Sequence, residues 1–165
     1  MAYVWLMVAR FAVRDEAISF TQSFDCSDIG TSLSGTVSLS CGVEAEEEDW
    51  TVYVVPRVAS GEYLNGHGGP ADDSEEAAMR EVGLVLYDRL RASLPSPESR
   101  WYAIVGTEVG DWMPIRAFEL DGPDLKECPV PGLILSKAVY RAVGSPSCFV
   151  PFGSADWVPW TGPRD

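Results

Sequence analysis

The sequence lacks every short motif that identifies a catalytic or metal-binding site. Its single histidine, His67, lies between glycines, and no G-x-S-x-G elbow accompanies it. The glycine-rich stretch around it is not followed by Gly-Lys-Ser/Thr, which excludes a P-loop. The four cysteines, at positions 26, 41, 128 and 148, form no C-x-x-C pair. We therefore expect no metal, no cofactor and no catalytic role for His67.

The sequence also lacks a long hydrophobic run. The apolar start, residues 2–9, is too short to span a bilayer and has neither the basic region nor the cleavage site of a signal peptide. A cytoplasmic protein is therefore expected. Because the cytosol is reducing, the cysteines are expected to be buried free thiols.

Basic residues are scarce. Twelve lysines and arginines face 25 acidic residues, which gives a net charge of −13 and an isoelectric point near 4.3. A field of this sign repels phosphate backbones and anionic lipid surfaces, and it attracts basic proteins. The sequence thus predicts a basic protein partner and argues against nucleic acid and membranes. The alternative is that the charge serves solubility alone.

The hydrophobic pattern predicts one α+β domain over 1–165, with a mostly antiparallel sheet of four to six strands. Strands are predicted at 2–13, 35–43, 50–56, 101–109 and 115–120. The second and third form a hairpin around the acidic turn at 44–49, whereas 19–34 is predicted to be an irregular connection. Val37, Leu39 and Cys41 alternate with polar residues, which is typical of a half-exposed strand.

Apolar residues at helical spacing predict one long helix at about 74–93 and a second at about 133–143. Asp73 and Glu76 have the spacing of a capping box at the start of the first helix. The second segment is also compatible with a strand. The aromatic and proline-rich tail, about 145–165, is predicted to be mostly extended.

The acidic residues are concentrated in residues 44–81, which carry eleven acids against two arginines. If the hairpin tip and the helix start lie on one side of the domain, they form a single negative patch. Tryptophans in glycine- and proline-rich segments are either covers over the core or binding anchors. The predicted partner-binding residues are Glu46, Glu47, Glu48, Asp49, Asp72, Asp73, Glu75, Glu76, Trp112, Trp157 and Trp160.

A short, acidic, tryptophan-rich chain without an active-site motif resembles the small bacterial immunity proteins that neutralise polymorphic toxins. The segments that carry this resemblance are 44–50, 72–76 and 152–160. The resemblance implies tight one-to-one binding to a basic toxin domain and no enzymatic activity. Two alternatives stay open: a small enzyme that uses scattered carboxylates on a carbohydrate or small polar ligand, and a structural or adaptor subunit of a larger assembly.

Overall fold

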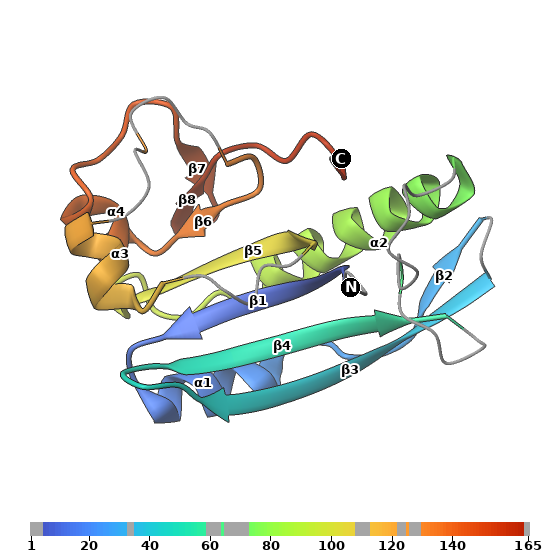
Figure 1. Ribbon diagram of the computed structural model, residues 1–165, viewed down its shortest axis with the longest axis horizontal. Helices are drawn as coiled ribbons and strands as arrows, with labels where there is room; N and C mark the ends of the chain where they lie inside the picture. The colour runs from blue at the N-terminus through green and yellow to red at the C-terminus, as the bar shows by residue number, and fades with distance from the viewer. Residues whose placement is uncertain are drawn as a thin grey trace.

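The computed structural model describes residues 5–32, 35–58, 64, 73–107, 113–121, 125 and 130–163 (Figure 1). The strands are β1 (Trp5–Phe11), β2 (Ile29–Thr31), β3 (Gly35–Ala45), β4 (Trp50–Arg57), β5 (Trp101–Thr107), β6 (Ile134–Leu135), β7 (Val150–Phe152) and β8 (Ala155–Trp157). The helices are α1 (Arg14–Ser23), α2 (Asp73–Ala92), α3 (Ile115–Asp121) and α4 (Lys137–Ala142).

The strands form one sheet in the order β2-β3-β4-β1-β5-β6-β8-β7, and every neighbouring pair is antiparallel. The predicted α+β class with an antiparallel sheet is therefore confirmed. The predicted number of strands was too low, because the described residues contribute eight. The short strands β2, β6, β7 and β8 supply the difference, and two or three residues are too few to show an alternating pattern.

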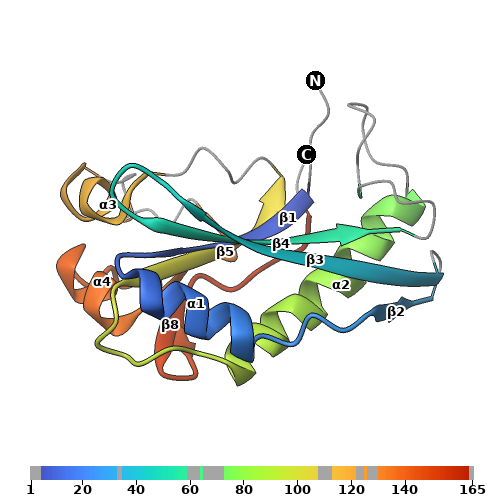
Figure 2. The same ribbon diagram turned by 90° about the horizontal axis from the view of Figure 1, so that it is seen from below.

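Side chains of the central strands alternate between two hydrophobic cores, one on each face of the sheet. Met7 and Phe11 point into the core beneath α1 and α2, whereas Val8 points into the core beneath α3 and α4. All seven residues of β1 are buried, including Arg10, which interrupts the otherwise apolar run. Figures 1 and 2 show α1 and α2 together on one side of β3 and β4.

The predicted hairpin is confirmed. Strands β3 and β4 pair from Ser38↔Arg57 to Ala45↔Trp50, so the acidic segment forms the turn between them. Val37 is fully buried while the neighbouring Ser38 is exposed, as the alternation indicates. The long helix is also confirmed, since α2 begins and ends within one residue of the predicted range.

Three predicted elements are wrong. Residues 14–23 form helix α1, part of which was expected to be irregular, because Ala17 and Phe20 lie one helical turn apart and are buried against the sheet. The strand expected at 115–120 is helix α3, which follows Pro114. The helix expected at 133–143 is divided between β6 and α4. Ser136 separates the two by accepting a hydrogen bond from the Val139 N–H at 3.2 Å, which caps α4.

The prediction of free thiols is wrong for Cys26 and Cys41, which form a disulfide bond. The bond ties the connection between α1 and β2 to the middle of β3. Both side chains pack partly buried against the core beneath α1 and α2. Cys148 is also disulfide-bonded, and its partner lies outside the described residues.

Candidate functional site

The acidic turn between β3 and β4 contains two carboxylates that point into the protein. Asp49 was predicted to be a solvated partner contact, but it is only 5% exposed. Its Oδ2 accepts a hydrogen bond from the backbone N–H of Ile115 at 2.6 Å and lies 3.8 Å from Nε of Arg10. Arg10, which is also buried, comes from β1. Asp49 therefore anchors the turn to α3 and to the sheet and does not reach the surface.

Glu46 forms the second anchor. One of its oxygens accepts a hydrogen bond from the Tyr53 hydroxyl at 3.1 Å, and the other lies 3.9 Å from Arg10. Burial and the neighbouring Glu46 raise the pKa of Tyr53, so its hydroxyl remains a donor. The Glu46 N–H donates to the Asp49 carbonyl at 2.9 Å and closes the turn. The side chain is half-buried and is a poor candidate for direct contact with a partner.

The remaining carboxylates of the turn face solvent. Glu44, Glu47 and Glu48 are exposed, and we call these three residues the acidic tip. Next to it, the guanidinium of Arg14 lies 5.4 Å from the centre of the Trp50 ring. The start of α1 and the acidic tip therefore lie at the same end of the molecule.

The acidic start of α2 lies at the other end, so the two segments do not form one patch. Glu81, two turns into α2, binds the backbone and hydroxyl of Ser32, just before β3. The acidic tip lies at the far end of β3, whose 11 residues span about 33 Å at about 3.3 Å per residue. Figures 1 and 2 show this separation along the long axis. Asp73 and Glu76 are exposed and Glu75 is half-exposed, whereas Asp72 lies outside the described residues.

The tryptophans of the tail cover the core. Trp157 and Trp160 are half-buried, and their rings lie 5.2 and 5.4 Å from the ring of Tyr87 on α2. Tyr87 is buried, donates to the Gly132 carbonyl and accepts from the Val105 N–H. Burial raises the pKa of this tyrosine. Trp157 and Trp160 thus hold the tail against α2, whereas Trp112 lies outside the described residues.

Gly83 gives a direct test of this packing. A Cβ at Gly83 would overlap the ring of Trp160, so Gly83→Ala must displace the tail from α2. We expect the free energy of unfolding to fall by about 1–3 kcal/mol, measured by urea denaturation followed by tryptophan fluorescence. Gly42→Ala is the matched control, because nothing lies within 4 Å of a Cβ there. Equal effects at the two positions would contradict the packing of Trp160 on α2.

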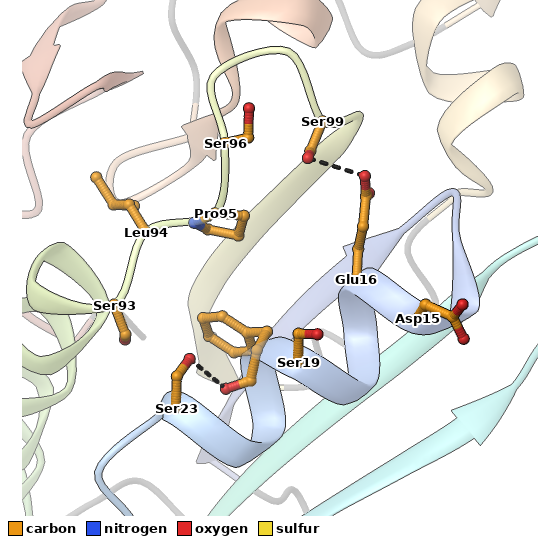
Figure 3. Close-up of a pocket in the computed structure, with 10 residues that line it drawn as sticks. Asp15, Glu16, Ser19, Ser23, Ser93, Leu94, Pro95, Ser96 and Ser99 are labelled. Carbon is orange, nitrogen blue, oxygen red and sulfur yellow. Dashed lines mark hydrogen bonds between the residues drawn. The ribbon is translucent and has the colours of Figure 1, made fainter.

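A groove that the sequence analysis missed lies between α1 and the connection from α2 to β5 (Figure 3). It has a volume of about 500 Å³. Its lining residues are Asp15, Glu16, Ser19, Phe20, Ser23, Ser93, Leu94, Pro95, Ser96 and Ser99. Five of these ten are serines, and we call it the serine groove. The positions on α1 recur at helical spacing along one face, a signal that would have required α1 to be predicted first.

Glu16 is the central polar group of the serine groove. One carboxylate oxygen accepts a hydrogen bond from the Ser99 hydroxyl at 2.9 Å, and Figure 3 shows this bond crossing the groove. The other oxygen, Oε2, is buried and has no hydrogen-bond partner among the described residues. A carboxylate oxygen in this condition needs a hydrogen-bond donor, and a charged donor above all, but the Glu16 side chain must turn toward the groove before a ligand can reach Oε2.

The described residues contain no group of three or more histidine, cysteine, aspartate or glutamate side chains arranged to hold a metal ion. His67 lies outside the described residues. None of the described helices is both long and apolar enough to cross a membrane. Comparison of the chain with protein-family models, curated proteins and solved structures finds no match.

Proposed function

We propose that the protein is a binding protein that inhibits a basic partner by forming a one-to-one complex, and that the acidic tip attracts this partner. The partner is a toxin domain, as the resemblance to immunity proteins implies. The observation that carries the proposal is the anchoring of the turn. Asp49 and Glu46 hold it to Arg10, Tyr53 and the start of α3.

Anchoring matters because it sets the cost of association. A flexible acidic loop would lose conformational freedom on binding, whereas an anchored turn presents Glu47 and Glu48 without this loss. Exposed charges at the rim of an interface act mainly on the rate of encounter. The acidic tip therefore fits the role of steering a basic surface toward this end of the molecule.

The disulfide favours an oxidising compartment as the place where this binding occurs. Disulfide bonds persist in secreted and periplasmic proteins and are rare in the cytosol, where thiols are kept reduced. We therefore propose that the protein meets its partner outside the cytosol, in place of the cytoplasmic location expected from the sequence.

The proposal predicts electrostatically steered association. Raising salt from about 10 mM to about 300 mM should slow association about tenfold and change dissociation much less. Reversing two charges of the acidic tip, Glu47→Lys with Glu48→Lys, should slow association similarly at low salt. The measurement is surface plasmon resonance against a candidate basic partner identified by pull-down or from the neighbouring genes.

The matched control reverses two exposed acids at the other end of the molecule, Asp73→Lys with Glu76→Lys. It makes the same change in net charge on exposed residues at the end of the molecule opposite the acidic tip. Slowing by the tip variant alone supports the proposal. Equal slowing by both variants would assign the effect to net charge, and slowing by the control alone would place the interface at α2.

A further inference from the structure

The groove between α1 and the 93–99 connection has no role in the function proposed above. Glu16, Ser19 and Ser23 come from one face of α1, and the opposite wall is the segment 93–99. At about 500 Å³ the groove is within the range of sites for small ligands, and it has room for one long side chain with part of its backbone. Its lining combines serine hydroxyls and the Glu16 carboxylate with the apolar side chains of Leu94 and Pro95.

The groove takes its negative charge from Glu16, at the start of α1, and the carbonyl groups of the last turn of α1 lie at its other end, near Ser23. Asp15 adds little, because its carboxylate is exposed, points away from Glu16 and lies 3.8 Å from Arg14. Helix carbonyl ends carry partial negative charge, and the last turn of α1 contains no basic residue to offset it. None of the ten described lining residues is basic. These features together favour a cation.

The floor and walls favour a cation on an aliphatic stem. Leu94 and Pro95, with the 3% exposed Phe20, line the groove and give the stem an apolar surface. Serine hydroxyls can accept hydrogen bonds from several N–H groups at once. A guanidinium, whose five donors form a planar fork, matches a carboxylate with one unpartnered oxygen and nearby hydroxyls.

We propose that the serine groove is a specificity pocket that takes an arginine side chain of the basic partner, with its guanidinium on Glu16. This inference rests on the proposed function. The groove and the acidic tip lie at the same end of the molecule, since Arg14, next to Asp15, contacts Trp50 beside the tip. The acidic tip then governs encounter, and the groove governs how long the complex lasts.

The first experiment uses agmatine, an alkyl guanidinium, as the probe and the whole protein as the target. Titration followed by ¹H–¹⁵N NMR should shift the amide signals of Glu16, Ser19, Ser23 and Ser96, with a dissociation constant in the millimolar range. N-butylurea, which is planar and uncharged, should bind at least about tenfold more weakly, because it lacks the charge that Glu16 recognises.

Glu16→Gln should weaken agmatine binding about tenfold. The amide oxygen of glutamine can still accept the bond from Ser99, so the fold is kept. Glu98→Gln is the matched control. Glu98 is exposed on the same connection, does not line the groove and pairs only loosely with Arg141 at 3.6 Å. It makes the same charge change and should alter binding less than twofold.

Equal weakening by the two variants would overturn the proposal, because it would indicate general charge attraction. Equal binding of agmatine and N-butylurea would also overturn it, as would signal shifts outside the groove. A second arm separates this inference from the proposed function. In the complex with the partner, Glu16→Gln should speed dissociation about tenfold, whereas reversal of Glu47 and Glu48 slows association. If Glu16→Gln leaves dissociation unchanged while the reversal still slows association, the proposal for the serine groove is wrong and the proposal for the acidic tip stands.

Discussion

Replacing Asp49 with alanine is expected to lower the free energy of unfolding by about 3–5 kcal/mol. The substitution removes one of the carboxylates that face the buried guanidinium of Arg10, and it removes the acceptor of the Ile115 N–H. A buried charge that loses a partner and an unsatisfied N–H are both costly away from water. Chemical denaturation monitored by circular dichroism measures the loss.

Two substitutions give this prediction its controls. Asp49→Asn keeps an oxygen that can accept from the Ile115 N–H, so it should cost less, about 1–3 kcal/mol. Glu48→Ala removes a neighbouring acid that is exposed, so it should change stability by less than about 0.5 kcal/mol. A cost at Glu48 equal to that at Asp49 would mean that Asp49 does not anchor the turn.

The pH dependence of stability reports on the same carboxyl group. Burial raises the pKa of Asp49 above its usual 3.8, and this effect outweighs the opposing influences of the Ile115 N–H and Arg10. The folded protein therefore holds this proton more tightly than the unfolded chain. As pH rises from about 3.8 through the raised pKa, the contribution of this carboxyl group to the free energy of unfolding falls. The advantage of the wild type over Asp49→Asn should shrink across this window, and a growing advantage would show that pairing with Arg10 dominates.

The hairpin and α2 could be predicted because their signals are local. The alternation of Val37, Leu39 and Cys41 lies within one strand, and the apolar stripe of α2 repeats over five turns. Helix α1 was missed because only Ala17 and Phe20 of its ten residues are buried, and serines and threonine surround them. Two buried positions do not establish a period.

The site could be predicted only in part, because its contacts join distant parts of the chain. The acidic turn looks uniform in sequence, and nothing in it shows that Asp49 turns toward Ile115, 66 residues away. The bond between Ser99 and Glu16 spans 83 residues, so no local pattern could indicate the serine groove. The net charge leads us to expect a basic partner, but the distribution of the acidic residues between the two ends of the molecule depends on the topology of the sheet.

Replacing Cys26 and Cys41 together with alanine is expected to lower the free energy of unfolding by about 3 kcal/mol. The bond joins residues separated by 15 positions, and a cross-link of this span restricts the unfolded chain by about that amount. It also holds the connection before β2 against β3. Denaturation without reductant measures the effect, with Ser27→Ala and Ser40→Ala as controls at the two exposed neighbours.

Thiol alkylation tests the same bond in the protein as cells make it. Cells are lysed into an alkylating reagent without reductant, and peptides are analysed by mass spectrometry. Cys26 and Cys41 should remain unmodified until a reductant is added, because a disulfide has no thiolate to react. Full alkylation of both before reduction would contradict the bond and would support the cytosolic location expected from the sequence. Since thiols stay reduced only where the cell maintains them so, this one measurement decides both the cross-link and the compartment.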